Sequence, residues 1–264
     1  MAPDAFKMAR RLHDRGVGAS VDQFGEQTLD DAGAKRVAAE YLRLADGLGD
    51  LPKDAWLSID LSHLGLDVDL LGCTEHLAAI AGRLSAGRRI QIGAEDHERA
   101  DAVLESVLTV ASLADRLGAT VQANLRRAPD DLERLIAAGV HIRPVKGAYV
   151  ESAARALPYG EATDVAYLHL AHRLAEADAR FALGTHDGVL REALLAALGP
   201  RPVEQPSRRP ALDIGRSRRA WRARARVPAL RRRLVPTLDA PPRRIPGQLT
   251  ATCSLIDRLA TPAR

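Results

Sequence analysis

The stretch that decides the fold is His141-Ile142-Arg143-Pro144-Val145-Lys146-Gly147-Ala148-Tyr149-Val150-Glu151. Residues 141–146 have the composition of a buried strand, and the two cations Arg143 and Lys146 lie at its end. A small Gly-Ala pair and a tyrosine follow at once. Charged residues at the carboxyl end of a parallel strand usually belong to a ligand site. The stretch therefore predicts an α/β fold with a functional site where this strand ends.

The same strand-then-helix pattern recurs along the first 200 residues. Further strands are expected over 18–24, 55–61, 89–94, 119–124 and 180–184. Helices are expected over 1–15, 30–48, 71–85, 97–117, from 129 onward, over 164–177 and after 188. Six such units predict a parallel sheet with right-handed crossovers. The spacing favours a TIM-like (β/α)8 barrel, distorted and incomplete at its C-terminal end, since a whole one takes about 250 residues.

A doubly wound open sheet is the alternative architecture. It has little support, because no Gly-x-Gly-x-x-Gly motif follows a strand and no P-loop is present. Gly16-Val17-Gly18 precedes a strand, so a turn is the simpler interpretation.

Charge divides the chain into two regions. Residues 201–264 hold 16 arginines, no lysine and four acidic residues, a net charge of +12, and nine of the 15 prolines. Residues 1–200 hold 22 basic and 30 acidic residues, a net charge of −8. We expect residues 1–204 to form the barrel. The Arg/Pro-rich segment 205–264 is expected to be disordered, because it buries little and repels itself.

The remaining composition points to a cytoplasmic protein. Cys73 and Cys253 are the only cysteines, which argues against a disulfide framework or a zinc site and fits a reducing compartment. Residues 1–15 have no continuous apolar core, unlike a signal peptide. The sequence also lacks an apolar run long enough for a transmembrane span.

Candidate site residues follow six different strand ends, as a barrel site requires. They are Asp22, Asp60, Glu95, Gln122, Asn124, Arg143, Lys146, Tyr149, Thr185, His186 and Asp187. Arg143 and Lys146 would attract an anionic ligand such as a diphosphate or a reduced flavin. The alternative is an ion pair with Glu151 or Asp187.

Three features of these candidates leave alternatives open. Gly147 would let a ligand approach the backbone, whereas Pro144 suggests a bulge in its strand. His186 could orient a cofactor or transfer a proton, but a purely structural histidine is as good an interpretation. Asp22, Asp60 and Glu95 could act as paired carboxylates, although spacing alone favours ordinary loop residues.

From Gly18 to about Glu204 the sequence resembles the FAD-dependent proline dehydrogenases of bacteria. The resemblance lies in Leu57–Gly65, Gly93–Asp96, Val121–Arg127, Arg143–Glu151 and Gly184–Asp187. It implies a distorted (β/α)8 barrel that oxidises L-proline to 1-pyrroline-5-carboxylate and passes electrons to a membrane quinone. It also implies a cytoplasmic protein that associates peripherally with the inner membrane face.

The resemblance also assigns roles to single residues. Ala94, Gln122, Lys146, Gly147, Ala148, Thr185 and His186 would contact or adjoin FAD. Arg143 would be the catalytic-site arginine, and Tyr149 would form one wall of the substrate pocket. No metal is implied.

Two positions and the C-terminal segment depart from the family pattern. Asp60 stands where the family commonly has a lysine for the substrate carboxylate, and Gly93 stands where an aspartate is usual. Nothing after about residue 205 resembles the family's last strands or its paired-arginine helix. A reading-frame shift near Glu204 would explain this difference.

Two other functions compete with proline oxidation. The chain could be an inactive remnant of the family that still binds flavin, since the paired-arginine helix, which clamps the substrate in the family, has no counterpart in this sequence. Residues 208–244 could instead bind nucleic acid as an electrostatic tail. That function ranks last, because Trp221 is the one aromatic residue available there for stacking.

Overall fold

Five parallel strands lie side by side in the order in which the chain forms them. The computed structural model describes residues 2–23, 25, 27–198, 205–206, 249–250 and 256–257. The strands are β1 (Ala19–Gln23), β2 (Ala55–Ile59), β3 (Ile90–Ile92), β4 (Leu117–Gln122) and β5 (His141–Val145). Sequential order means that every right-handed crossover advances in the same direction and leaves its helix on the same face. A doubly wound sheet would reverse its order, so this order is that of a barrel wall.

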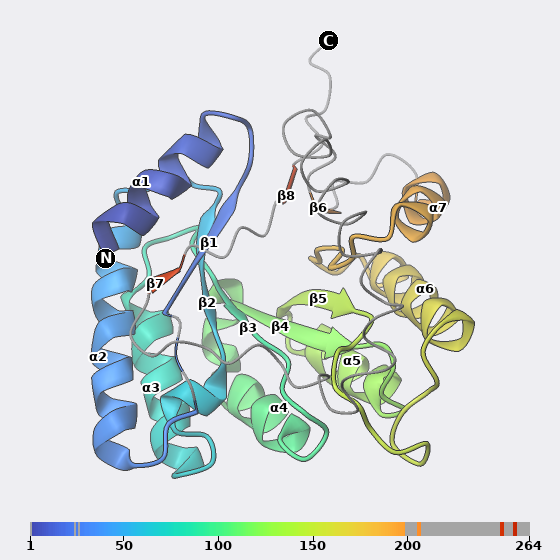
Figure 1. The fold of residues 1–264 in the computed structure, drawn as a ribbon, viewed down its shortest axis with the longest axis horizontal. Coiled ribbons are helices and arrows are strands. Elements are labelled where there is room, and N and C mark those ends of the chain that lie inside the picture. The colour runs from blue at the N-terminus through green and yellow to red at the C-terminus, as the bar shows by residue number, and fades with distance from the viewer. Residues whose placement is uncertain are drawn as a thin grey trace, which may run out of the picture.

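The helices follow one another around the outer side of this wall (Figure 1). They are α1 (Ala2–His13), α2 (Asp31–Leu48), α3 (Leu70–Arg83), α4 (Ala100–Thr109), α5 (Ala128–Ala137), α6 (Glu161–Glu176) and α7 (Gly188–Leu198). Two 3₁₀ helices, η1 (Leu61–Leu64) and η2 (Ala111–Arg116), complete the described helical elements. The helix expected over 97–117 is thus shorter, because α4 ends at Thr109 and the chain continues through η2, with a kink at Leu113, before it enters β4.

Local sequence explains where several helices begin. The Asp30 carboxylate accepts a hydrogen bond from Gly33 N at 2.5 Å and thereby caps α2. Asp69 caps α3 through Leu71 N at 3.1 Å, and Pro129 occupies the first turn of α5. The two aspartates satisfy N–H groups that have no partner inside the helix, which contributes about 1 kcal/mol per cap, and the proline fits the first turn because it has no N–H group to satisfy.

One face of the sheet carries the hydrophobic core. Leu57 and Ile59 of β2, Ile90 and Ile92 of β3 and Ile142 of β5 are fully buried. They pack in one cluster with Leu44 of α2, Leu77 and Ile80 of α3 and Leu132 of α5. Because side chains alternate across a strand, the residues between them lie on the opposite, inner face.

The sixth expected strand forms fewer pairing contacts than a regular strand. Residues 181–184 pair with β5 through two isolated parallel bridges, Ile142 with Phe181 and Val145 with Gly184. Pro144 explains this pairing, because a proline at that position has no N–H to donate toward the neighbouring segment. Its carbonyl still accepts a bond from Gly184 N at 3.0 Å. The register of β4 against β5 runs unbroken through Pro144, so the expected bulge is wrong.

Three short strands lie in the C-terminal segment. β7 (Leu249–Thr250) pairs antiparallel with β1, and β6 (Gln205–Pro206) pairs with β8 (Ile256–Asp257). The rest of 205–264, and with it the prediction of disorder, lies outside the described residues. None of the helices in the described part of the chain is long and apolar enough to span a bilayer.

Candidate functional site

The inner face of the sheet is polar. Gln91 Nε2 donates to Thr120 Oγ1 at 3.2 Å, and Arg143 Nη2 donates to the same oxygen at 3.1 Å. Arg89 stacks on the Trp56 ring with its guanidinium carbon 4.9 Å from the centroid. Polar side chains of β3, β4 and β5 therefore meet on the face that the helices do not cover.

Arg143 is a half-buried cation on this face. Burial and the nearby positive charge of Arg89 lower the pKa of Arg143 to about 10, and Asp60 opposes that shift. Its Nε is buried and has no hydrogen-bond partner. The described residues give Arg143 no ion pair, so the alternative of a salt bridge with Glu151 or Asp187 does not apply to it. A half-buried guanidinium with spare donors is suited to an anionic or electron-rich ligand.

Lys146, by contrast, is held by two carboxylates. Its Nζ lies 2.6 Å from Asp164 Oδ1 of α6 and 2.9 Å from Asp187 Oδ2. These hydrogen bonds and charges raise the pKa of Lys146 in spite of partial burial. The sequence suggested Asp187 as an ion-pair partner but missed Asp164. The position of Asp164 in the first turn of α6 was the available signal, since that turn faces the carboxyl end of β5 in a barrel.

Gly147 is the point of closest backbone packing at the site. Its φ is +110°, a conformation that a residue with a side chain rarely adopts. A Cβ there would also overlap the Asn124 side-chain amide, whose Nδ2 would lie 2.9 Å away. Asn124 is itself buried, and its Oδ1 has no hydrogen-bond partner. Both the backbone and the space thus require glycine, and Ala148 follows it as an exposed residue.

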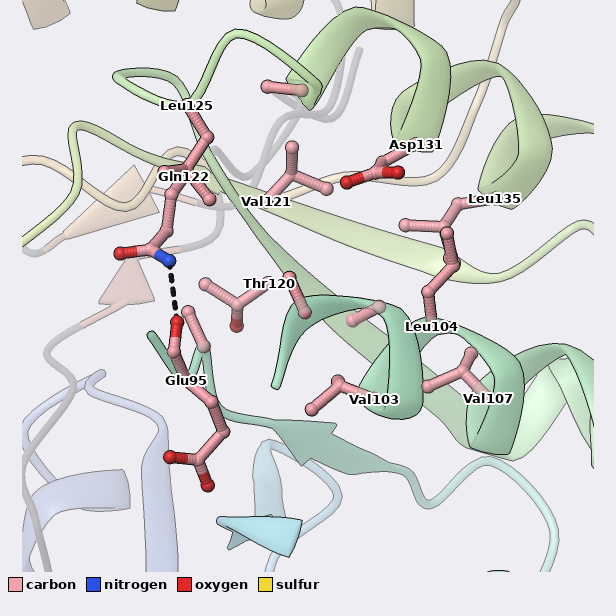
Figure 2. Close-up of a pocket in the computed structure, with 14 residues that line it drawn as sticks. Glu95, Val103, Leu104, Val107, Thr120, Val121, Gln122, Leu125, Asp131 and Leu135 are labelled. Atoms are coloured by element: carbon pink, nitrogen blue, oxygen red, sulfur yellow. Dashed lines mark hydrogen bonds between the residues drawn. The ribbon is translucent and has the colours of Figure 1, made fainter. Parts of the chain in front are cut away.

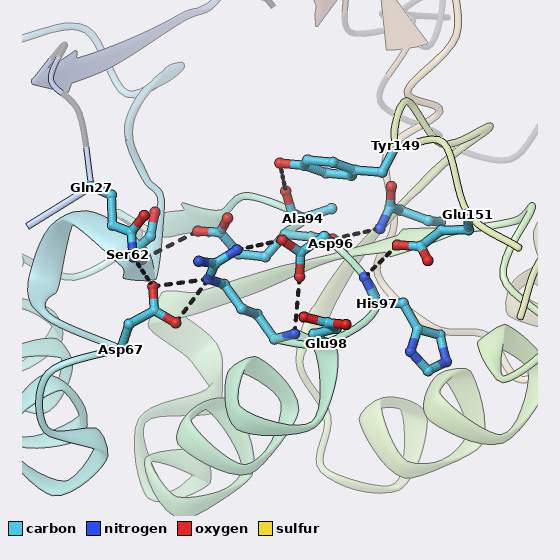
Figure 3. Close-up of polar contacts among 12 residues, drawn as sticks. Gln27, Ser62, Asp67, Ala94, Asp96, His97, Glu98, Tyr149 and Glu151 are labelled. Atoms are coloured by element: carbon cyan, nitrogen blue, oxygen red, sulfur yellow. Dashed lines mark hydrogen bonds and ion pairs between the residues drawn. The ribbon is translucent and has the colours of Figure 1, made fainter. Parts of the chain in front are cut away.

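The loops after β3, β4 and β5 meet beside this point. Gln122 Nε2 donates to Glu95 O at 2.8 Å, and Tyr149 Oη donates to Ala94 O at 3.2 Å. Figure 3 shows the Tyr149 ring lying across the loop that contains Ala94. The structure therefore brings Ala94, Gln122 and Tyr149 together, as the sequence predicts.

Polar contacts fix these loops around the mouth of the sheet (Figure 3). Arg99 Nε lies 2.8 Å from Asp67 Oδ1, and its Nη1 pairs with Asp96. Glu151 Oε1 accepts a bond from His97 N at 2.9 Å. No motif in the sequence indicates this network, because Asp67, the 96–99 segment and Glu151 lie far apart in the chain.

The loop after the sixth strand supplies two more of the predicted residues. Thr185 is buried, and its Oγ1 accepts a bond from Asp187 N at 3.1 Å. Asp187 Oδ1 also accepts from Val189 N at 3.0 Å and from Leu190 N at 3.2 Å, so Asp187 caps α7. These contacts, and above all the bond to Lys146, lower the pKa of Asp187. His186 lies exposed between the two.

The carboxylates after β1, β2 and β3 are not one cluster of equal members. Asp22 Oδ1 accepts from Tyr41 Oη at 2.7 Å, which ties β1 to α2. Glu95 Oε1 accepts from Ser62 N at 3.1 Å. Burial raises the pKa of Glu95, and the negative charge of Asp60 adds to that shift. Asp60 therefore lies near Glu95, whereas Asp22 has a structural contact of its own.

A narrow cavity lies on the other side of β4. Figure 2 shows Val103, Leu104 and Val107 of α4 facing Val121 and Leu135 across it. The cavity volume is about 50 Å3, and the lining is mainly apolar. Glu95 and Gln122 are among its lining residues, and a cavity of this volume is too small for a flavin. Among the described residues, no three His, Cys, Asp or Glu side chains gather where they could hold a metal ion.

Comparison with known proteins identifies the family of this chain and supports the interpretation of its fold. The family model described as proline dehydrogenase matches residues 5–198. Proline dehydrogenase 1 of Bacillus subtilis subsp. natto is 30% identical over 187 residues, which are 69% of this chain and 61% of that protein. Proline dehydrogenase of Deinococcus radiodurans is 29% identical over 189 residues, with the same coverage. The chain thus spans about 61% of the length of these curated relatives.

Solved structures agree on the fold. Proline utilization A from Bdellovibrio bacteriovorus, inactivated by N-propargylglycine, superposes with a TM-score of 0.64 at 17% identity and covers 75% of this chain and 25% of that one. Proline utilization A from Bradyrhizobium japonicum gives 0.64 at 20% identity, over 71% of this chain and 23% of that one. This likeness confirms the TIM-barrel-like α/β fold. By its family match and its curated relatives, the chain belongs to the proline dehydrogenase family.

Proposed function

We propose that this chain oxidises L-proline to 1-pyrroline-5-carboxylate, with FAD as its cofactor. Family membership supports proline as the substrate. The observation that carries the proposal is the half-buried Arg143 on the polar inner face, with no ion pair among the described residues and a buried Nε donor that has no partner. Such a group favours the negative charge that a two-electron acceptor gains on reduction.

The residues around Arg143 fit a flavin. Gly147 has no side chain of its own, and the buried Asn124 Oδ1 packed beside it lacks a partner. Lys146 supplies positive charge on the same loop. Gln122, Ala148, Thr185 and His186 would make further contacts, and Ala94 would lie beside the ring system. When bound, FAD supplies the acceptor for the hydride that leaves the substrate carbon next to nitrogen.

The chain's own residues would position the substrate and exclude water. Tyr149 lies over the loop of Ala94, where its ring would form one wall of the substrate pocket. Asp60 lies on the inner face near Arg143, where it would form another wall. Arg143 would hold the developing negative charge. The ion-paired loops around the mouth keep these groups in place, so little reorganisation is needed during the reaction.

The electron acceptor and the location follow from the same proposal. We propose that electrons pass from the reduced cofactor to a membrane quinone, with the protein in the cytoplasm and associated peripherally with the inner membrane face. The nucleic-acid alternative rests on residues 208–244, which lie outside the described residues.

A second candidate is a family member that binds flavin without turning over proline. The observation that favours it is Lys146, which already contacts Asp164 and Asp187 and has less charge to offer a ligand. Asp60, at a position where a cation would attract the substrate carboxylate, points the same way.

Turnover with an added electron-acceptor dye separates the two candidates. The full chain, saturated with FAD, is mixed with L-proline and the dye, and the product is identified by mass spectrometry. Proline dehydrogenase activity predicts dye reduction and a product that is lighter than proline by two hydrogens. Retained flavin with no product would support the second candidate and overturn the first.

A further inference from the structure

Asp60 fills the space that a side chain at residue 93 would take. A Cβ built on Gly93 would overlap Asp60 Oδ1 and lie 3.1 Å from its Cγ, whereas the next nearest group, Ile59 O, is 3.7 Å away. The backbone at Gly93 is not left-handed, so its conformation alone does not require glycine. The lack of a side chain at 93 therefore has one visible consequence: it lets the Asp60 carboxylate lie over β3 on the inner face.

The carboxylate in this position lies close to the other charged groups of the site. Its negative charge acts on Arg143 of β5, on Glu95 after β3 and on Tyr41 of α2. Asp60 thus follows β2, and its carboxylate lies against Gly93, the residue after β3. Asp60 and Arg143 supply charges of opposite sign to the same part of that face.

This arrangement suits a substrate that carries both charges. An amino acid in neutral water has a carboxylate and an ammonium group. A carboxylate placed beside Asp60 would be repelled, whereas an ammonium group there would form a charge-assisted hydrogen bond. Glu95 Oε1 accepts a hydrogen bond from Ser62 N at 3.1 Å, whereas Asp60 is the acid whose charge acts on Arg143.

We infer that Asp60, seated over Gly93, binds the secondary ammonium group of the substrate and so orients the ring with its carboxylate away from β2. This inference rests on the proposed function, because it takes a cyclic amino acid as the ligand. It predicts that affinity depends on the ring nitrogen. A ring of the same size with a carboxylate but no nitrogen gains nothing from Asp60 and is repelled by it.

The test compares two probes by isothermal titration calorimetry on the full chain. The probes are L-proline and cyclopentanecarboxylate, which lacks the nitrogen. Asp60→Asn should lower the affinity for L-proline by about 10- to 100-fold, which is what a hydrogen bond between charged groups contributes. The same variant should leave cyclopentanecarboxylate unchanged or bind it more tightly. Equal weakening of both probes, or of neither, overturns the inference.

Two further variants make the comparison specific. Gly93→Ala should reproduce the effect of Asp60→Asn, because its methyl group displaces the carboxylate while the Asp60 side chain remains. Asp50→Asn removes one exposed carboxylate before β2, at the opposite edge of the sheet, and should change neither affinity. If Gly93→Ala binds L-proline as tightly as the wild type, the placement of Asp60 over Gly93 has no role in binding and the inference is wrong.

The outcome for the proposed function is separate. Wild-type protein that binds L-proline but yields no oxidised product overturns the proposed oxidation, and the Asp60 comparison still decides the inference. If the wild-type protein turns over proline and Asp60→Asn binds L-proline with unchanged affinity, the inference is overturned and the proposed oxidation stands. Wild-type protein that binds neither probe overturns both.

Discussion

The two faces of the same sheet differ in polarity: the outer face is apolar and the inner face is polar. The outer face holds Leu57, Ile59, Ile90, Ile92 and Ile142, which are fully buried against the helices. The inner face holds arginine, glutamine and threonine in hydrogen-bonded contact, with several buried polar atoms that have no partner. Burying polar atoms without partners costs free energy. A protein retains such a face where a ligand completes it, whereas the outer face contributes stability.

Truncation on the outer face should have the largest effect on stability. Leu57→Ala removes a fully buried side chain and should lower the free energy of unfolding by about 2–5 kcal/mol. Ser58→Ala changes the next residue of the same strand on the inner face and should cost under about 1 kcal/mol. Urea denaturation of both variants measures the difference. Equal losses would contradict the division between the two faces.

Removing the inner cation should affect activity and spare the fold. Arg143→Met should lower kcat/KM for proline by about 100- to 1000-fold, the usual effect of losing one group that stabilises developing charge. Its unfolding free energy should not fall, because a half-buried charge without an ion pair is replaced by an apolar side chain. Steady-state kinetics and urea denaturation test both statements. Arg134→Met on the surface of α5 is the control and should change neither quantity measurably.

Gly147 marks the point where the site constrains the backbone. Gly147→Ala should destabilise the protein by about 1–3 kcal/mol, because its φ of +110° is strained for alanine and the Asn124 amide must move. It should also lower the affinity for FAD, which a titration of the apoprotein with FAD measures. Gly139→Ala is the matched control, since its φ is +69° but nothing lies within 4 Å of its Cβ. A larger loss of FAD affinity in Gly139→Ala would contradict the assignment.

Substitution of Glu95 should have the smallest effect on stability, and that effect should depend on pH. Its pKa is raised from 4.5 mainly by burial, so the folded chain holds the proton more tightly than the unfolded chain. Stability is therefore lost as pH rises from 4.5 through the folded pKa. Glu95→Gln removes that loss and should stabilise the protein at pH 7 but not below about pH 4.

Glu133 provides a control of the opposite sign. Its pKa is lowered by Arg173, so its ionised form contributes stability above the ordinary pKa that is lost in acid. Glu133→Gln should therefore destabilise slightly at pH 7. Urea denaturation at both pH values compares the two variants. A gain for Glu95→Gln that is the same at both pH values would show that charge is not its cause.

Periodic features were predictable from the sequence. The five strands β1 to β5 and the helices α2, α3 and α5 lie within a few residues of the predicted ranges, because apolar runs and helix caps are local signals. Helix α4 is the exception, since it ends at Thr109 and the predicted range runs to 117. The sixth strand is less regular, since Pro144 weakens its pairing with β5. Arg143, Lys146, Gly147 and Tyr149 were found because they share one short segment.

The remaining features depend on residues that meet only after folding. Asp164 contacts Lys146 from another helix, and Asn124 fills the space beside Gly147 from the next strand. The placement of Asp60 over Gly93 joins two loops that are 33 positions apart. No periodicity or motif reports such contacts, since they depend on register and on the curvature of the sheet.

The most direct test of the site is the visible absorbance of the full chain under anaerobic conditions. Wild-type protein incubated with FAD should remain coloured after gel filtration, and L-proline should bleach it with one equivalent of oxidised product per flavin. Arg143→Met should stay coloured and bleach far more slowly. A folded wild-type protein that emerges colourless, or whose colour L-proline does not change, would contradict the assignment of the polar inner face as a flavin and proline site.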